Sequence, residues 1–237
     1  MMRRATVLAV AALAAAGAAV VVLSRVRARG AGDPTPEEGS LFRVYAPGGK
    51  YGFLANGPVG QAIARIMPMM EGDVYDAVAE MLDPQPDDAL LDIGCGPGAF
   101  LATKAQDAQT VVGLDPSATM LSVAERELAP RLEEGTARLV TGSAAELPFR
   151  DGEFSAVTAI FAPFDRAEVL RVLKPGGRFV VADNDPRRSS SEPISRWGRQ
   201  RWSEAEHRQM LQEAGFVDLA VRGQGAYLFV SCRKPAD

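Results

Sequence analysis

The chain has 237 residues and a formal net charge of -4, with 47% apolar and 24% charged residues. This length favours one main domain with an attachment, and the composition excludes a disordered or collagen-like chain. Two cysteines and one histidine cannot build a disulfide framework. They are also too few for the four ligands of a structural zinc site. The mild acidity gives no indication of nucleic-acid binding. We therefore expect neither a metal nor a nucleic acid as a partner.

Residues 1–30 differ from this average composition. An uncharged run extends from Ala5 to Leu23, and a helix of that length spans about 28 Å, close to the hydrocarbon core of a bilayer. The flanks carry arginines and no acid. A membrane anchor is favoured and a cleaved signal peptide is the second interpretation, because a soluble helix would leave most of its circumference apolar.

The charge on the two flanks of this run is nearly equal, so it does not set the orientation in a membrane. We expect the following domain to lie on the cytoplasmic side, with secretion after signal cleavage as the alternative. Residues 31–39 (AGDPTPEEG) form an expected linker, because proline, glycine and acidic residues there cannot bury a face. One domain is then expected over residues 40–237.

Residues 60–82 have apolar side chains at helical spacing, and Pro68 and Gly72 are expected to divide them into two helices. Strand and helix patterns then alternate along the chain. Strands are predicted at 89–93, 110–114, 137–140, 155–160, 178–182, 216–221 and 227–232, with helices at 99–105, 117–128, 166–173 and after Ser203. The alternation predicts a doubly wound α/β fold with a mostly parallel seven-stranded sheet. The last two strands are predicted to form an antiparallel hairpin.

Two short sequence signals predict where helices begin. Asp165 and Glu168 have the spacing of a helix cap and its third residue, and Ser203 and Glu206 repeat it. His207, inside the second of these polar helices, is expected on a solvated face.

A glycine-rich turn follows the first predicted strand directly, in the run LLDIGCGPGAF from Leu90 to Phe100. Glycines let a backbone turn tightly and let a ligand approach closely. Asp115 closes the second predicted strand, about 20 residues further on, where a carboxylate is suited to ribose hydroxyls. Together the two features predict a site for a nucleoside-containing cofactor.

The spacing of the glycines and a nearby acid indicate which cofactor it is. A dinucleotide fingerprint reads G-x-G-x-x-G, whereas this turn reads G-x-G-x-G with Asp92 just before it. A carboxylate there is a poor neighbour for a pyrophosphate and a good one for an ammonium group. S-adenosylmethionine carries a ribose, an ammonium group and a sulfonium, so it suits the turn better than NAD.

The stretch from Leu90 to Asp183 resembles the class I S-adenosylmethionine-dependent methyltransferases that modify small molecules and lipids. The matching segments are LLDIGCGPGAF, VVGLDPSATML, GSAAELPFRDGEFSAV and EVLRVLKPGGRFVVAD. The resemblance places the cofactor-binding core at residues 88–183. It implies methyl transfer to a small or lipid-like acceptor by a membrane-tethered enzyme.

The resemblance also assigns cofactor-binding roles to individual residues. The methionine end would lie against Asp92 and the turn, the ribose against Asp115, and the adenine against the segments that follow the second and third strands. The residues so assigned are Asp92, Gly94, Cys95, Gly96, Pro97, Gly98, Asp115, Pro116, Ser117, Ser143, Ala144 and Phe161. No catalytic residue is assigned, because methyl transfer requires alignment and water exclusion more than a general base.

The sequence departs from the family pattern at two places. Ser143 stands where relatives commonly have an acid, and the segment from Ile160 to Val169 is shorter than the usual strand-to-helix loop. A non-catalytic binding or scaffold protein that retains the fold is therefore the second interpretation, and an NAD-dependent oxidoreductase is a distant third. Cys95 is interpreted as a small packed residue rather than a nucleophile.

The segment 187–201 carries five arginines and one acid, with Trp197 inside it and Trp202 beside it. A solvated loop is slightly favoured. Contact with anionic lipid headgroups is the alternative, because basic and tryptophan-bearing segments bind membrane surfaces.

Overall fold

The computed structural model describes residues 55–187 and 202–236, and these fall within one compact unit. The expected anchor and linker lie outside the described residues, as does the 187–201 segment apart from Arg187. Within the described ranges, no helix combines the length and apolar character needed to cross a membrane.

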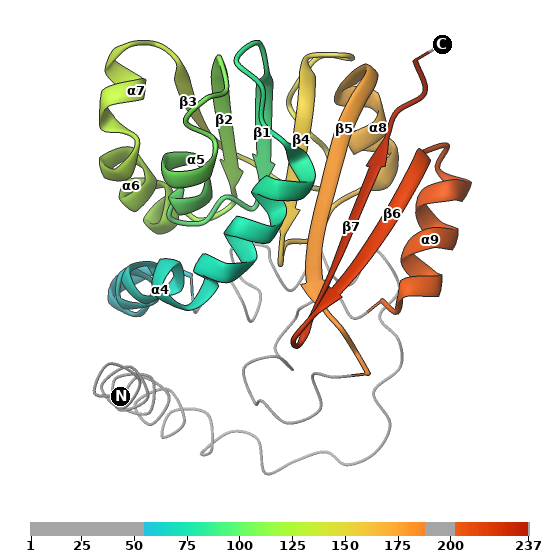
Figure 1. Cartoon of the computed structure of the whole chain (residues 1–237). Coiled ribbons are helices and arrows are strands. Elements are labelled where there is room, and N and C mark those ends of the chain that lie inside the picture. The colour runs from blue at the N-terminus through green and yellow to red at the C-terminus, as the bar shows by residue number, and fades with distance from the viewer. Residues whose placement is uncertain (1–54, 188–201, 237) are drawn as a thin grey trace. The chain divides into compact units, whose positions relative to one another are not determined.

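The described strands form one seven-stranded sheet in the order β3-β2-β1-β4-β5-β7-β6 (Figure 1). β1 to β5 are parallel to one another, whereas β7 is antiparallel to both β5 and β6. This confirms the predicted doubly wound fold and its terminal hairpin. The elements in chain order are α4 (Gly57–Leu82), β1 (Ala89–Ile93), α5 (Ala99–Lys104), β2 (Thr110–Asp115), α6 (Ala118–Glu127), α7 (Ala129–Glu133), β3 (Ala137–Thr141), β4 (Phe154–Ile160), α8 (Arg166–Val172), β5 (Leu173–Asn184), α9 (Glu204–Glu213), β6 (Val217–Gln224) and β7 (Tyr227–Arg233).

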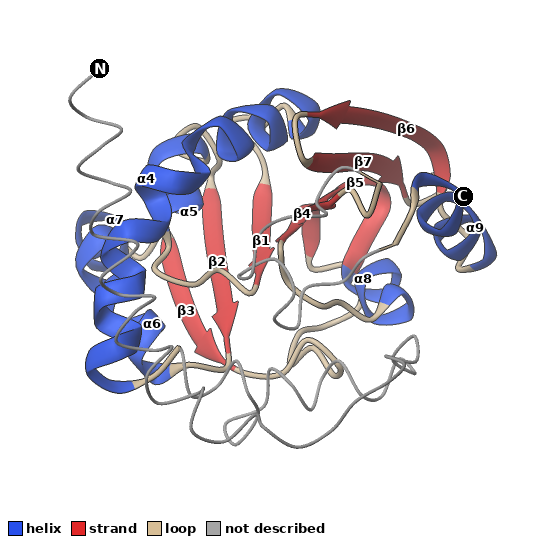
Figure 2. Ribbon diagram, turned by 90° about the horizontal axis from the view of Figure 1, so that it is seen from below, coloured by secondary structure: helices blue, strands red, loops and turns tan. Residues whose placement is uncertain are grey.

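Helices cover both faces of the sheet, as seen from the carboxyl ends of its parallel strands in Figure 2. α4 and α5 bury apolar residues against one face, including Val78 and Phe100. α8 and α9 pack against the other face through residues such as Val169 and Leu211. Because strand side chains alternate between faces, residues two apart on one strand lie under the same helices. A side chain at the carboxyl edge of the sheet can therefore be assigned to a face from the residue two positions before it.

α4 is a single helix, so the predicted division at Pro68 and Gly72 was wrong. A proline removes one backbone donor and disfavours a helix interior by about 3 kcal/mol. Packing on both sides of Pro68 offsets this loss. Ala64 lies in a small cluster with residues of α6, and Val78 is fully buried against the sheet. The sequence pattern of α4 alone does not reveal these tertiary contacts.

β5 begins earlier than predicted, at Leu173 instead of residue 178. Its register with β4 shifts between the pairs Phe154↔Leu173 and Ala156↔Arg178, so residues 174–177 protrude between two paired positions. These four residues (KPGG) therefore form a bulge inside the strand. The helix predicted at 117–128 is confirmed as α6, and a further short helix, α7, follows it.

His207 is buried, which contradicts its expected solvated position. Its ring lies 5.4 Å from the ring of Trp202, measured between centroids. Burial lowers the pKa of the imidazole, although hydrogen bonds that the ring makes to the neighbouring backbone oppose the shift. The prediction failed because the polar sequence around His207 does not reveal that this one side chain faces the sheet.

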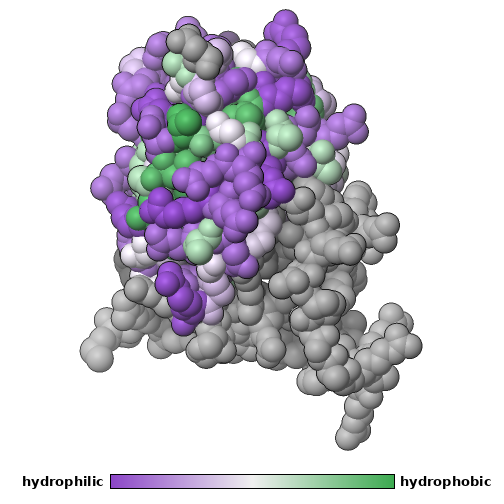
Figure 3. All heavy atoms as spheres, turned by 90° about the vertical axis from the view of Figure 1, so that its right-hand side faces the viewer, coloured by the Kyte–Doolittle hydropathy of each residue, from purple (hydrophilic) through white to green (hydrophobic). Residues whose placement is uncertain are grey.

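The side of the molecule around the edge strand β6 exposes mostly polar side chains. Figure 3 shows the side of the molecule that carries β6 and α9, where hydrophilic residues surround smaller apolar groups. The register between β6 and β7 shifts between Val217 and Ala220, and Asp218 in this bulge has φ 55°. Charge and a bulge at an open edge disfavour pairing with a second chain.

The capping box at the start of α9 is confirmed and can be tested by substitution. The Ser203 side chain accepts a hydrogen bond from the Glu206 N–H at 3.3 Å, and the Glu206 carboxylate accepts one from the Ser203 N–H at 2.7 Å. Ser203→Ala is expected to lower the free energy of unfolding by about 1 kcal/mol, because a backbone donor loses its partner. Urea denaturation measures the change. Ser122→Ala in α6, whose hydroxyl donates only to its own helix, is the control and should be near neutral.

Candidate active site

The glycine turn between β1 and α5 has a backbone that requires glycine at two of its positions. Gly94, Gly96 and Gly98 all have positive φ, at 71°, 52° and 76°. A Cβ on Gly94 would lie 2.4 Å from the Cβ of Ala162, and one on Gly98 would lie 2.9 Å from the Cβ of Ala124. Both distances are shorter than van der Waals contact. At Gly96 the nearest atom is 3.7 Å away, so the turn has free space only on that side.

Asp115, at the end of β2, holds the glycine turn from the neighbouring strand. One carboxylate oxygen accepts the N–H of Gly96 at 2.9 Å, and the other accepts the N–H of Ser117 at 2.8 Å. Burial raises the pKa of this carboxyl to about 6, and the two hydrogen bonds oppose the shift. Each oxygen keeps a second lone pair. The carboxylate can therefore accept hydrogen bonds from a vicinal diol while it holds the turn.

Asp92, near the end of β1, is a second buried carboxylate. It accepts a hydrogen bond from the Thr158 hydroxyl at 2.8 Å. Burial is the largest cause of a rise in its pKa to about 7; the Thr158 bond opposes the rise, and the charges of Asp115 and Glu71 add to it. A buried carboxylate whose charge is disfavoured in this way gains stability from a cationic ligand. The electrostatics therefore favour an ammonium or sulfonium group.

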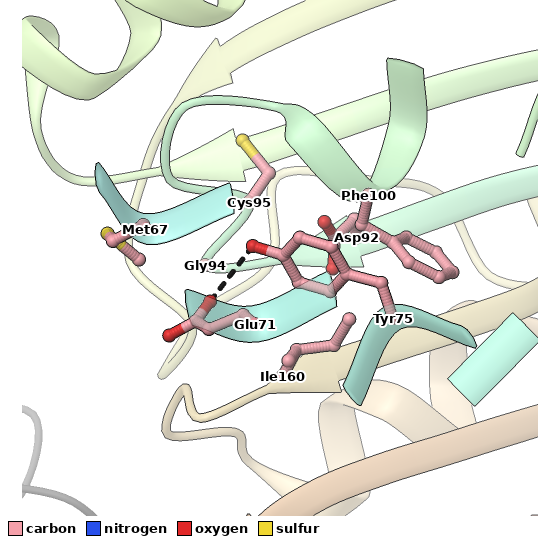
Figure 4. A pocket seen from close by; sticks show the side chains of 8 residues that line it. All are labelled: Met67, Glu71, Tyr75, Asp92, Gly94, Cys95, Phe100 and Ile160. Atoms are coloured by element: carbon pink, nitrogen blue, oxygen red, sulfur yellow. Dashed lines mark hydrogen bonds between the residues drawn. The ribbon is translucent and has the colours of Figure 1, made fainter. Parts of the chain in front are cut away.

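Asp92 faces a small cavity under α4 (Figure 4). Three side chains of α4 form one wall, and the Tyr75 hydroxyl donates a hydrogen bond to the Glu71 carboxylate at 2.9 Å. The cavity has a volume of about 20 Å³, close to the space of one water molecule. A larger ligand therefore requires the α4 side chains to rotate away. The lining residues are Met67, Glu71, Tyr75, Asp92, Gly94, Cys95, Phe100 and Ile160.

Sequence reasoning did not assign Met67, Glu71 or Tyr75 of α4 to this site. The available signal was Glu71 itself, an acid within an otherwise apolar helical stripe and four residues before Tyr75. A spacing of four places two side chains on one helix face. That spacing could have predicted the pair, but not the strand beneath it.

The structure brings some of the predicted site residues together and separates others. Asp92, Gly94 and Cys95 line the cavity, and Asp115 is joined to the turn at Gly96. The Phe161 ring lies 5.3 Å from that of Tyr227, at the ends of β4 and β7. The other predicted residues, which do not line this cavity, are Pro97, Gly98, Pro116, Ser143 and Ala144.

The segment after β3, which was assigned to the adenine, lies beside Asp115. The N–H of Gly142 donates to the Asp115 backbone carbonyl at 3.3 Å. Ser143 is exposed and its hydroxyl accepts the Ala145 N–H at 3.2 Å. Ala144 packs against the apolar cluster under α8 and α9. Of this pair, Ser143 is therefore the one whose side chain is accessible to a ligand.

Part of the chain is similar in sequence to known methyltransferases. The family described as "Methyltransferase domain" matches residues 90–177. A demethylmenaquinone methyltransferase of Symbiobacterium thermophilum is 38% identical over 125 residues, which are 48% of this chain and 47% of that protein. The chain spans about half the length of the curated relatives it matches.

Solved structures share the fold at low sequence identity. Geranyl diphosphate C-methyltransferase from Streptomyces coelicolor A3(2), in complex with Mg²⁺, geranyl diphosphate and S-adenosyl-L-homocysteine, aligns with a TM-score of 0.57 at 16% identity, over 76% of this chain and 85% of that chain. The [4+2]-cyclase SpnF aligns with a TM-score of 0.57 at 20% identity, over 77% and 84% of the two chains.

Residues 90–177 match a methyltransferase domain, in agreement with the predicted resemblance to class I S-adenosylmethionine-dependent methyltransferases. The family match begins at Leu90 and ends at Gly177, so it includes the glycine turn, Asp92 and Asp115. S-adenosylmethionine is the cofactor of this family, as the sequence predicted. The donor set of the methyltransferase domain fits it, because Asp92 and Glu71 suit its cationic end and Asp115 suits a ribose.

Cys95 has the environment of a packed residue in the methyltransferase domain. Its thiol is buried and donates only a weak hydrogen bond to the Gly96 carbonyl, at 3.7 Å. Burial, together with the charges of Asp115 and Asp92, raises the pKa of the thiol well above its usual value. A protonated thiol is a poor nucleophile, so Cys95 contributes shape to the cavity.

The close approach at Gly94 predicts the effect of adding one methyl group. Gly94→Ala is expected to destabilise the domain by about 1–3 kcal/mol more than Gly135→Ala, because only the first substitution overlaps another side chain. Gly135 is the matched control: its φ is 73°, and nothing lies within 4 Å of its added Cβ. Urea denaturation measures both variants. Equal losses would show that Ala162 does not constrain the turn.

The raised pKa of Asp92 predicts a pH dependence of ligand binding. A cationic ligand group binds the ionised carboxylate, so affinity for S-adenosylhomocysteine should increase about tenfold from pH 6 to pH 8 as Asp92 ionises. In the ligand-free chain the same raised pKa makes stability fall as the pH rises from about 4 through about 7. Calorimetry at several pH values measures the affinity.

Asp92→Asn should remove most of this pH dependence, because the amide does not titrate. Asp87→Asn, which alters an exposed carboxylate, should leave it unchanged. A pH profile that is identical in wild type and Asp92→Asn would contradict the assignment of the cationic end to Asp92.

Proposed function

We propose that this chain transfers a methyl group from S-adenosylmethionine to a small, lipid-like acceptor. The observation that carries the proposal is the pair of buried carboxylates at the carboxyl ends of β1 and β2. Asp92 and Asp115 both have a raised pKa, and both lie against the glycine turn. The name of the curated relative, demethylmenaquinone methyltransferase, supports an acceptor with a lipid-like quinone character.

The chain's own residues supply binding, orientation and exclusion of water. When bound, S-adenosylmethionine supplies a methyl group on a sulfonium for in-line displacement by the acceptor. Asp92 and Glu71 orient the cationic end, and Asp115 orients the ribose. α4 covers this region of the sheet and keeps water from it. Alignment of this kind accelerates a displacement without a general base.

A non-catalytic binding or scaffold protein is the second candidate function. The observation that favours it is the cavity volume of about 20 Å³, which admits no methionine group without movement of α4 side chains. The fold alone does not decide between the two candidates, because SpnF, a cyclase by name, shares it. An NAD-dependent oxidoreductase remains the third and least favoured candidate.

Calorimetry and a methyl-transfer assay together separate these three candidates. Wild type is expected to bind S-adenosylmethionine and S-adenosylhomocysteine and not NAD, and Asp115→Ala should weaken both by about tenfold or more, because diol hydrogen bonds and the bracing of the turn are lost. Asp151→Ala, an exposed carboxylate remote from the turn, is the control. Transfer of a labelled methyl group to a cell lipid extract then distinguishes the enzyme from the scaffold. Cofactor binding without any transfer would leave the scaffold as the better proposal.

We also propose that residues 1–30 anchor the chain in a membrane, with the domain on the cytoplasmic side, where S-adenosylmethionine is made. The apolar run from Ala5 to Leu23 supports the anchor. Protease treatment of intact cells should leave the domain intact. Degradation of the domain under that treatment would contradict the cytoplasmic placement, and recovery of the chain in the soluble fraction would contradict the anchor.

Contact of the 187–201 segment with anionic headgroups is a further part of this membrane proposal. Arg187 is already engaged within the chain, because its Nε lies 3.4 Å from Asp185 and its Nη2 lies 4.0 Å from Glu204. Arg188 and Arg199 are therefore the better positions for charge reversal to Glu. Vesicles that contain phosphatidylglycerol should bind the double variant more weakly than wild type. Unchanged binding would exclude the headgroup contact.

A further inference from the structure

Asn184, at the carboxyl end of β5, carries a polar group for which the fold provides no partner. The side chain is 3% exposed, and its Nδ2 has no hydrogen-bond partner within the described part of the chain. An unsatisfied buried donor of this kind costs about 1–3 kcal/mol, so a native example requires an explanation. The other buried nitrogens that lack partners there are Arg178 Nε, His207 Nε2 and Arg222 Nε.

The register of the sheet places Asn184 on the face that α4 covers. Ala182, two residues earlier on β5, belongs to the apolar cluster of that face, together with residues of α4. Alternation along the strand puts Asn184 on the same face. His207 is different, because α9 packs on the opposite face. Arg178 is also different, because its guanidinium forms an ion pair with Asp88 at the amino end of the sheet.

Two aromatic rings accompany the amide. Tyr227 is the direct partner of Asn184 across the β5–β7 pair, so the two side chains share a face. The Phe161 ring lies 5.3 Å from the Tyr227 ring, with 56° between the ring planes. Phe161 also has φ 52°, a left-handed conformation that is uncommon for an aromatic residue. Strained backbone of this kind is concentrated at functional sites.

This group lies on the same sheet face as the proposed methyl-donor site. Asp92 and Thr158 form one cross-strand row, and Ile160, which lines the cavity, lies one row nearer to Asn184. From strand spacings, Asp92 and Asn184 are about 16 Å apart. A span of this length matches the methionine end of the donor followed by one planar ring, which would occupy it once the α4 side chains rotate away. It is too long for a direct contact between the two residues.

We propose that Asn184 is a specificity-determining residue that donates a hydrogen bond to an oxygen on the ring of the methyl acceptor. Phe161 and Tyr227 supply apolar surface to the ring itself. The acceptor class is then an aromatic compound that carries an oxygen on its ring, with any lipid tail outside this contact. The inference rests on the proposed function for its acceptor, but it concerns binding at Asn184 and can be measured without methyl transfer.

The test compares binding of two ring compounds to the full chain saturated with S-adenosylhomocysteine. The probes are 1-naphthol, which carries a ring oxygen, and 1-methylnaphthalene, which has the same shape without one. Wild type should bind 1-naphthol about tenfold more tightly than 1-methylnaphthalene, measured by fluorescence titration. Asn184→Leu, which keeps the volume and removes the amide, should abolish this preference.

Two further variants complete the test. Gln224→Leu removes an exposed amide from the same cross-strand row, beside Tyr227, and should leave the preference intact. Asn184→Ala removes the amide and offers no acceptor to the probe hydroxyl, so it should also lose the preference if Asn184→Leu fails to fold. In every folded variant, the affinity for S-adenosylhomocysteine should remain that of wild type.

The outcomes separate this inference from the proposed function. A wild type without the 1-naphthol preference, or an Asn184→Leu variant that retains it, would overturn the role of Asn184. Loss of S-adenosylhomocysteine binding in both Asn184 variants would also overturn it, because the residue would then support the cofactor site. Failure of wild type to methylate any lipid in the labelled-transfer assay, with the 1-naphthol preference intact, would instead overturn the proposed function.

Discussion

The carboxylate of Asp115 holds together the two turns on which the site depends. It accepts one N–H from the glycine turn and one from the start of α6, so the ends of β1 and β2 are fixed relative to each other. The Ser117 hydroxyl, which caps α6, also donates to the Ala55 carbonyl at 2.6 Å, which joins the beginning of α4 to the same point. A single buried acid thus positions the glycine turn, the helix after β2 and the entry to the cover helix.

Burial of several acids near this point explains why the site suits a cation. Burial is the main cause of the raised pKa of Asp92, and the charges of Asp115 and Glu71 add to it. A positive ligand group relieves both effects. The same burial keeps the Cys95 thiol protonated. The ligand preference is therefore a property of the whole group of residues and of the helix that covers them.

At the carboxyl edge of the sheet, the two faces carry different kinds of side chain. The face under α4 carries Asp92, Asn184 and Tyr227, which are polar or aromatic, together with Ile160, and these residues surround the proposed donor and acceptor positions. The opposite face, under α8 and α9, is a continuous apolar core. The buried His207 on that side packs against Trp202 and serves structure. Because side chains alternate along each strand, the proposed site residues lie on one face and the core residues under α8 and α9 lie on the other.

The sequence by itself determined the order of strands and helices, the terminal hairpin, both helix caps, the glycine turn and the acid at the end of β2, because each depends on neighbours in the chain. It did not determine the continuity of α4 through Pro68, the burial of His207, the α4 side chains in the cavity or the unpartnered amide of Asn184. Those features depend on contacts between segments far apart in the sequence. Tertiary packing decided them, because burial against a sheet outweighs the local preference of a proline or a polar residue.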